Sequence, residues 1–370
     1  MPQFDPDTHV HTLPNGVRVV TITTPHLATA AVSVFVQSGS QHESARLNGI
    51  SHVVEHMAFK GTAQRSCQQI NLDAERLGAE VNAHTDKDHT AFHMRGMSGH
   101  AGDFIRMLGE IVRESNFPEA ELERERQVIL HEFAEDEDDA LSNAFRLFDK
   151  ACYGEHPVAR PVIGNRRNIQ RFKRADLVDY VASQYTGANT IVGVAGAVDS
   201  AQVVRAVEAA FGGMPAASPN RVAMPEYLGG IASRRLAGYS QAHLVLGFPI
   251  PALGQPHASA QVAAALLGEG MSSPLLDELR ERRALVYHAA CSADVSGLCG
   301  QMVIEASTTP PQVDEFFSAV ARLLRAQLDH TDPVGLERAR NQIIVRSLLD
   351  RKSTRLNSSH HAISRMPSSA

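Results

Sequence analysis

His52, Glu55 and His56 stand in the order His-x-x-Glu-His, inside the stretch GISHVVEHMAFKGT at residues 49–62. On a helix the two histidines lie one turn apart, so both imidazoles leave the same face. Two neutral imidazoles held in this way suit a zinc ion. Glu55 directly precedes His56 and would project beside the metal, where its carboxylate could accept a proton from water.

This order is the reverse of the His-Glu-x-x-His of most zinc peptidases, and it is the inverzincin signature. Chance alone would give about 0.05 copies of the pattern in a chain of this composition. The alternative is a surface helix that carries two solvated histidines. The neighbours argue against it, because they make the helix apolar on most of its circumference: Val53, Val54, Met57, Ala58 and Phe59.

A third, oxygen ligand would complete a His-His-Glu site with one position open for water. The candidates lie in an acidic segment, residues 118–148, that the pattern predicts as one long helix. Glu125 and Glu132 are seven residues apart, close to two full turns, and therefore share one side. Val128 and Ile129 make that side partly apolar. The spacing alone does not choose between the two carboxylates.

Residues 80–85 and 90–95 alternate like strands and carry further histidines in and between them. His84, His89 and His93 are additional metal candidates. Their spacing fits no helical face shared with His52 and His56, so surface or edge-strand histidines are the alternative interpretation.

The remaining pattern predicts an α+β protein of two similar domains, each a mostly antiparallel sheet backed by helices, with the second domain truncated. Asn48 or Ser51 is expected to cap the motif helix. Strands are expected at 11–13, 17–22, 30–36, 80–85, 90–95, 190–195 and 243–248, and helices at 66–77, 100–115, 118–148, 176–185, 201–211, 257–267 and 333–349.

Residues 212–228 hold three Pro and two Gly and mark the predicted boundary between the domains. We expect a zinc-binding domain at 1–213, a linker at 214–228 and a second domain without metal ligands at 229–349. Residues 350–360, DRKSTRLNSSH, resemble a translated sequencing adapter. Residues 350–370 are therefore expected to be a foreign tail.

Composition excludes several classes of protein. The 35 basic and 41 acidic side chains give a net charge of −6 without a basic stripe, so nucleic acid is an unexpected partner. No apolar run could span a bilayer, and the N-terminus does not resemble a signal peptide. The four cysteines show no Cys-x-x-Cys spacing and predict reduced thiols in a cytoplasmic protein.

Four ordered stretches, HVVEHMAFKGT, GAEVNAHTDKDHTAFHMRG, LERERQVILHEF and HPVARPVIGNRRNI, resemble the pitrilysin/insulinase family of zinc peptidases. The short chain is most similar to the mitochondrial-processing-peptidase-like branch. The resemblance implies that His52, His56 and Glu132 bind Zn²⁺ and that Glu55 is the general base. It also implies that Glu125 supports the site without touching the metal.

The same resemblance implies where a peptide would bind. Asn82 and Ala83 match the edge strand along which the family lays its substrate, a form of strand addition. Arg280 and Tyr287 match an Arg and a Tyr with which the family binds substrate and steadies the oxyanion from the second domain. An ordinary surface Arg and a core Tyr are the alternative.

Two positions near Arg280 depart from the family pattern. Pro274 stands where an Arg is usual, and Ala284 stands where a Gly is usual. Because of these two substitutions, the family pattern alone does not define the local backbone of this segment.

Together these features predict a zinc-dependent endopeptidase that hydrolyses extended peptides or unfolded segments, with Glu55 as general base. Because one chain carries both halves of the chemistry, a homodimer is expected, and a heterodimer is the alternative. Two rival functions are an inactive scaffold subunit of the same fold and a non-peptidase zinc enzyme with a small substrate.

Overall fold

The computed structural model describes the backbone of residues 7–352 and the side chains of residues 8–347. The fold is α+β, as predicted, and its contacts divide the chain into two compact units. Unit 1 contains the residues up to Phe133 together with Pro161–Arg221, and unit 2 contains Ala134–Arg160 and Val222–Arg351. A segment that precedes the predicted linker therefore contacts the C-terminal half of the chain.

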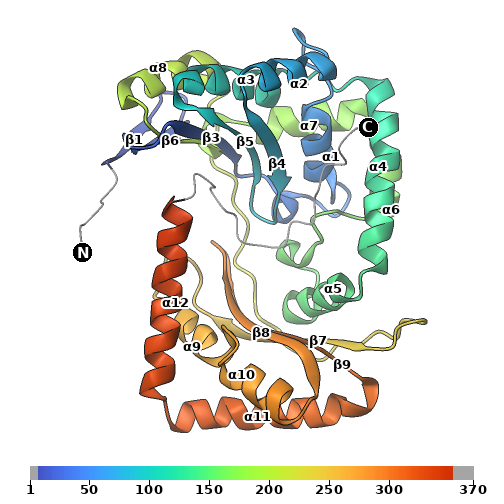
Figure 1. Ribbon diagram of the computed structural model, residues 1–370. Helices are drawn as coiled ribbons and strands as arrows, with labels where there is room; N and C mark the ends of the chain where they lie inside the picture. The colour runs from blue at the N-terminus through green and yellow to red at the C-terminus, as the bar shows by residue number, and fades with distance from the viewer. Residues whose placement is uncertain (1–6, 353–370) are drawn as a thin grey trace. The chain divides into compact units, whose positions relative to one another are not determined.

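Unit 1 is built on a six-stranded sheet of order β1-β2-β6-β3-β5-β4, so β1 and β4 are its edges (Figure 1). Neighbouring strands are antiparallel except β2 and β6, which are parallel. The predicted hairpin is confirmed between β1 and β2, where Gly16 takes a φ of 95° that favours glycine. The strands are β1 Asp7–Thr12, β2 Arg18–Thr23, β3 Thr29–Val36, β4 Glu80–Thr85, β5 Thr90–Met97 and β6 Thr190–Gly196.

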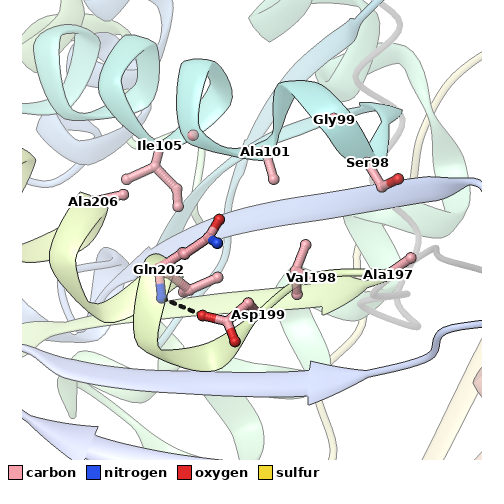
Figure 2. Close-up of a pocket in the computed structure, with 11 residues that line it drawn as sticks. Ser98, Gly99, Ala101, Ile105, Ala197, Val198, Asp199, Gln202 and Ala206 are labelled. Carbon is pink, nitrogen blue, oxygen red and sulfur yellow. Dashed lines mark hydrogen bonds between the residues drawn. The ribbon is translucent and has the colours of Figure 1, made fainter.

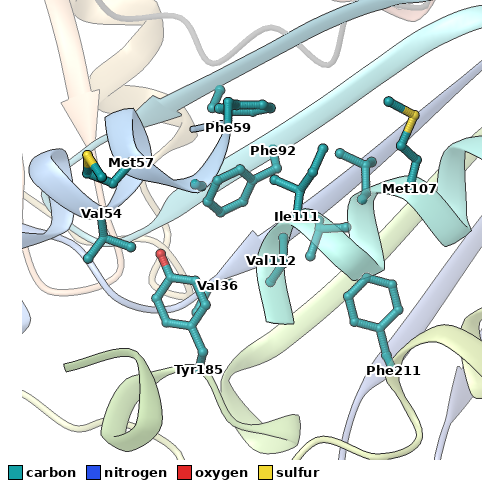
Figure 3. Packing of buried hydrophobic residues seen from close by; sticks show 14 of the residues in the cluster. Val36, Val54, Met57, Phe59, Phe92, Met107, Ile111, Val112, Tyr185 and Phe211 are labelled. Carbon is teal, nitrogen blue, oxygen red and sulfur yellow. The ribbon is translucent and has the colours of Figure 1, made fainter. Parts of the chain in front are cut away.

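Helices cover the core face of this sheet. Figure 3 shows Val54 and Met57 of the motif helix beside Phe92 of β5 and Tyr185, which follows α7. Met57 and Phe92 are fully buried, so core packing fixes the helix that carries the motif. The helices are α1 Ile50–Ala58, α2 Cys67–Arg76, α3 Ala101–Glu114, α4 Glu119–Asp138, α6 Arg166–Arg171, α7 Arg174–Gln184 and α8 Ser200–Phe211.

Two local predictions were wrong. The single helix expected at 118–148 is broken after Asp138, because the Asp139 side chain accepts a hydrogen bond from the Ser142 amide and caps α5, Ala140–Tyr153. The motif helix is capped neither by Asn48 nor by Ser51. Gly49 is its first flanking residue, with a φ of 100° that glycine adopts without strain.

Unit 2 holds an antiparallel three-stranded sheet of order β7-β9-β8, with helices on both faces. On β9, Ile304 packs in the cluster formed with α9–α11, whereas Val303 packs with Phe148 of α5 on the opposite face. The elements are β7 Ala242–Ile250, α9 Ala258–Gly268, α10 Pro274–Leu276, η5 Asp277–Arg282, β8 Val286–Val295, β9 Gly300–Thr308, α11 Val313–Asp329 and α12 Pro333–Lys352.

Three expectations concern the chain as a whole. The backbone of residues 350–352 continues α12, and the rest of the segment predicted as foreign lies outside the described residues. Within the described part, no helix combines the length and the apolar character needed to cross a membrane. None of the four cysteines, Cys67, Cys152, Cys291 and Cys299, forms a disulfide.

Candidate metal centre

Helix α1 presents the motif from inside the protein. His52 is 7% exposed and Glu55 is 3% exposed, and the helix is buried on nearly all sides. A helix of this kind cannot carry two solvated histidines. The interpretation of the motif as an ordinary surface helix is therefore excluded.

The N-terminus of α1 is fixed by a buried carboxylate. Glu43 Oε2 accepts hydrogen bonds from the Gly49 amide at 2.8 Å and from Asn48 Nδ2 at 2.9 Å, and Oε1 accepts one from the Ser51 amide at 2.8 Å. An anion at this end of a helix also complements the exposed amides. Sequence reasoning missed Glu43, because it lies outside the helix and caps it from an irregular segment.

Helix α4 brings Glu132 to the two imidazoles. Glu132 Oε2 lies 3.6 Å from His52 Nε2 and 3.4 Å from His56 Nε2. This oxygen is buried but accepts no hydrogen bond from the described residues. Within the part of the chain that the structure describes, these three side chains are the one group whose metal-binding atoms lie within 4.8 Å of each other. A buried carboxylate oxygen without a hydrogen-bond partner, beside two imidazole nitrogens, fits a bound cation.

Glu125 lies on the other side of the His56 ring. Its Oε2 is 3.1 Å from His56 Nδ1, and its Oε1 is 2.5 Å from Lys60 Nζ. A carboxylate on the second ring nitrogen holds a metal-binding histidine in one tautomer and orientation. The spacing could not separate Glu125 from Glu132, whereas the structure places them on different nitrogens of His56. Lys60 was missed, although its i+4 spacing from His56 is the signal that could have found it.

Glu55 is held by the edge strand β4. Thr85 Oγ1 donates a hydrogen bond of 2.6 Å to Glu55 Oε2. Burial is the main cause that raises the pKa of the Glu55 carboxyl above its ordinary value, and the hydrogen bond from Thr85 partly opposes it. Sequence reasoning missed Thr85, because nothing local links a strand residue to a helix 30 positions earlier.

Comparison with known proteins decides the family of this chain. A family model described as "Insulinase (Peptidase family M16)" matches residues 18–166, and a second, described as "Peptidase M16 inactive domain", matches residues 171–343. The chain belongs to the M16 peptidase family. The recognition made from the four stretches of sequence is confirmed at this level.

Relatives in this M16 family are named as zinc proteases. An uncharacterized zinc protease of Bacillus subtilis is 30% identical and covers 93% of this chain and 84% of its own length. Another, from Mycobacterium leprae, is 32% identical and covers 85% and 72%. A third, from Rickettsia felis, is 27% identical and covers 90% and 82%.

Solved M16-like structures share the fold. A protease from Helicobacter pylori superposes with a TM-score of 0.85 at 23% identity, over 94% of this chain and 87% of that one. A Pseudomonas fluorescens protein, described as a peptidase M16 inactive domain, gives a TM-score of 0.83 at 20% identity, over 94% and 84%. These similarities confirm two M16-like domains with sheets backed by helices.

Zinc is the cofactor that the names of the relatives and the donor set indicate together. Two imidazoles and one carboxylate are the protein ligands of one class of catalytic zinc site, which leaves a position open. Burial, then the neighbouring His56, lowers the pKa of His52 to about 4, so its imidazole is neutral and can bind a metal. Although burial opposes it, the carboxylates of Glu125 and Glu132 raise the pKa of His56 to about 9. A metal cation bound between His52, His56 and Glu132 would replace the proton that His56 carries at neutral pH.

The predicted substrate residues lie on a free sheet edge. Asn82 and Ala83 belong to β4, whose second side pairs with no strand of the described chain. Asn82 is exposed, and its Oδ1 accepts a hydrogen bond of 2.8 Å from the Ala83 amide. An edge strand without a second partner strand is the element to which a peptide is added in strand addition.

The other three candidate histidines bond to one another and do not join the His52 group. His84 Nε2 lies 3.1 Å from His89 Nε2, and His84 Nδ1 lies 3.1 Å from His93 Nε2. His93 Nδ1 contacts Ser33 Oγ at 2.7 Å, and His89 Nδ1 contacts Asp88 Oδ1 at 2.5 Å. A continuous chain of contacts from Asp88 through the three rings to Ser33 satisfies these ring nitrogens without a metal.

Arg280 and Tyr287 meet on unit 2. The Arg280 guanidinium lies 5.4 Å from the centre of the Tyr287 ring, in a cation–π arrangement. Tyr287 is 81% exposed, so the core-tyrosine alternative is excluded. The register of β8 and β9 slips between Val286 and Ala289, and such a bulge turns a side chain out of the regular alternation.

The structure also explains the two departures from the family pattern. Pro274 is the first residue of α10, a position where its missing amide hydrogen costs nothing, and Ser273 caps the turn. Ala284 has a φ of 50°, in the left-handed region that favours the usual Gly. Pro274 therefore fits the local backbone without strain, whereas Ala284 occupies a strained backbone conformation.

A separate pocket lies between the first turns of α3 and α8 (Figure 2). Its volume is about 460 Å³, and small side chains such as Ala101 and Ala206 form much of its wall. Its one acidic lining residue, Asp199, accepts a hydrogen bond of 2.8 Å from the Gln202 amide and so caps α8. None of the sequence-predicted site residues lines this pocket.

Proposed function

We propose that this chain is a zinc-dependent endopeptidase that hydrolyses extended peptides or unfolded segments. The observation that carries the proposal is the convergence of His52 Nε2, His56 Nε2 and Glu132 Oε2 beside a buried Glu55. Membership of the M16 family supports the protease class. The exposed edge of β4 supports an extended peptide as substrate.

The metal, when bound by His52, His56 and Glu132, supplies a Lewis acid that makes water more acidic. Glu55 takes the proton of the attacking water and later delivers it to the leaving amine, and a raised pKa suits both steps. Glu125 holds the ring of His56 in place. Arg280 and the Tyr287 hydroxyl would donate to the charge that develops on the carbonyl oxygen.

The proposal includes the setting in which the enzyme acts. We propose a cytoplasmic homodimer of the mitochondrial-processing-peptidase-like branch, because one chain carries both the zinc residues and the Arg280–Tyr287 pair. Cysteines without disulfides support a reducing compartment. A native protein that is active and that sediments strictly as a monomer would contradict the dimer.

The two rival functions predict different behaviour of the same residues. An inactive scaffold subunit has no use for an intact set of His52, Glu55, His56 and Glu132, although the second family model is described as inactive over residues 171–343. A small-substrate enzyme has no use for a free strand edge beside the base. A metal assay tests the scaffold, and a peptide-cleavage screen separates the small-substrate enzyme from the proposed endopeptidase.

The experiment compares the native protein with Glu55→Gln and Glu132→Gln, measuring bound zinc and cleavage of a peptide library. We expect Glu55→Gln to keep zinc and lose cleavage, because only the base is removed, and Glu132→Gln to lose zinc. Normal cleavage by Glu55→Gln would refute the mechanism. A native protein that binds zinc and cleaves no peptide would favour the scaffold or the small-substrate enzyme.

A further inference from the structure

Thr85 connects the base to the strand on which we place the substrate. It is the last residue of β4, and its hydroxyl lies 2.6 Å from Glu55 Oε2. Ala83, two residues earlier on the same strand, is part of the predicted peptide-binding edge. Glu55 is 3% exposed, and the Thr85 hydroxyl is a direct hydrogen-bond partner of its carboxylate.

The backbone pattern of β4 shows which residues face the free edge. The Asp86 amide donates to the His89 carbonyl at 2.8 Å, which continues the β4–β5 register by one pair. In an antiparallel ladder hydrogen-bonded pairs alternate, so positions 82 and 84 also bond toward β5. Positions 83 and 85 therefore turn their amides and carbonyls to the free edge. The Ala83 amide donates to Asn82 Oδ1 and not to β5, which agrees with this alternation of positions along the strand.

We propose that Thr85 is a positioning residue that sets the orientation of Glu55 from the substrate-binding strand. The inference rests on the proposed peptidase function. A peptide paired at position 83 would lie one two-residue repeat, about 7 Å along the strand, from the residue that holds the base. The scissile carbonyl and the base would then be placed by one rigid element, which is what a catalytic constellation requires.

The alternative role of Thr85 is purely structural, as a hydroxyl that satisfies a buried carboxylate. The two roles differ in what a substitution changes. A structural loss lowers stability or zinc content, whereas a loss of positioning lowers kcat while KM and bound zinc stay unchanged. Thr85→Val removes the hydroxyl at nearly constant shape, and Thr85→Ser keeps the hydroxyl.

Thr90 offers a matched control, because it pairs with Thr85 across β4 and β5. Its hydroxyl is also a hydrogen-bond donor, in a fully buried position, but it bonds to the Ser38 carbonyl at 2.8 Å and is no part of the proposed site. Thr90→Val therefore removes a comparable hydrogen bond from the neighbouring strand without releasing Glu55.

The test measures zinc content, thermal midpoint, kcat and KM of the full chain with one peptide that the native protein cleaves. We expect Thr85→Val to lower kcat about tenfold or more, the scale of one hydrogen bond to a charged group, with KM and zinc unchanged. Thr85→Ser should stay within about twofold of the native kcat, and Thr90→Val should keep it. If Thr85→Val does not fold, Thr85→Ala replaces it in the same comparison.

An unchanged kcat in Thr85→Val would overturn the inference, and so would a Thr85→Ser variant as slow as Thr85→Val. Loss of zinc in parallel with kcat would assign Thr85 a structural role. A native protein that cleaves no peptide would refute the proposed function and this inference together, whereas a cleaving protein with an unaffected Thr85→Val would refute only the inference.

Discussion

At the scale of residues, the centre is organised around the two nitrogens of one ring. His56 Nε2 faces Glu132, and His56 Nδ1 faces Glu125, whose other oxygen contacts Lys60. The sequence alone does not distinguish the two glutamates. Their roles differ because each faces a different nitrogen of the His56 ring. Besides His56, Lys60 is the basic side chain that contacts Glu125 within the described part of the site, and its ammonium group stabilises the charge of this carboxylate.

The first prediction is that Lys60→Met weakens zinc binding about tenfold or more, the lower end of the effect of groups that orient metal ligands. Without the ammonium group, Glu125 loses the partner that fixes its Oε1 and can leave His56. Competition with a chromophoric chelator measures the affinity. Lys60→Arg keeps the charge and should bind zinc nearly as the native protein does. Equal affinities of the native protein and Lys60→Met would contradict the role of Lys60.

The second prediction concerns the exposed Tyr287 hydroxyl. Tyr287→Phe should reduce turnover by roughly a hundredfold, the loss typical of one oxyanion donor, and leave zinc binding unchanged. Steady-state kinetics and metal analysis on the same samples check it. Tyr239→Phe, which removes another partly exposed tyrosine hydroxyl of unit 2, is the control that should keep turnover. If Tyr287→Phe turned over normally, the exposed ring would need another explanation.

Sequence patterns predicted the residues that a motif spaces along one helix, and they did not predict residues joined only by the fold. His52 and His56 share one face of a short helix and Glu55 lies beside them on the same turn, so their meeting follows from helical periodicity. Thr85 and Glu43 reach that helix from a strand and an irregular segment. Such contacts depend on tertiary packing, which local spacing does not contain.

At the scale of elements, most helices and strands lie close to their predicted ranges, because their apolar periodicity is strong. One exception is the acidic segment after residue 118, where Asp139 caps a new helix. The cap was not predicted, because Asp139 follows a run of acidic residues and each of them fits an exposed position within a helix. The break matters, because α5 then packs in unit 2 while Glu125 and Glu132 belong to unit 1. In unit 2, no element was predicted at β8, β9 or α11.

The third prediction follows from Ala284, which lies two residues after η5 in a left-handed conformation. Ala284→Gly should stabilise unit 2 by roughly 0.5–1 kcal/mol, because relief of the left-handed strain exceeds the greater chain entropy that glycine loses on folding. Thermal unfolding measures the change as a rise of a few degrees. Ala321→Gly, at an exposed position within α11, should instead lower stability by about 1 kcal/mol. Equal signs for the two variants would contradict this account.

At the scale of the molecule, the two units differ in whether zinc binding can stabilise them. Every residue of the His52, His56 and Glu132 group lies in unit 1, and unit 2 is held by hydrophobic clusters of its own. A ligand that binds only the native form of one unit stabilises that unit by mass action. Zinc is therefore expected to act on the stability of unit 1 alone.

The last prediction is that removing zinc with a chelator loosens unit 1 selectively. At free zinc near 1,000 times Kd, binding contributes about 4 kcal/mol, which is a large part of the stability of a domain. Hydrogen exchange followed by mass spectrometry should then show faster exchange in α1 and β4, where the ligand helix and the strand that holds Glu55 lie. Exchange in β8 and β9 should stay unchanged, since no group of the candidate metal centre belongs to unit 2. Glu132→Gln should reproduce the pattern without chelator, because it removes a ligand and leaves both sheets intact. An equal increase in β8 and β9 would show that zinc stabilises the whole chain and that the two units unfold together.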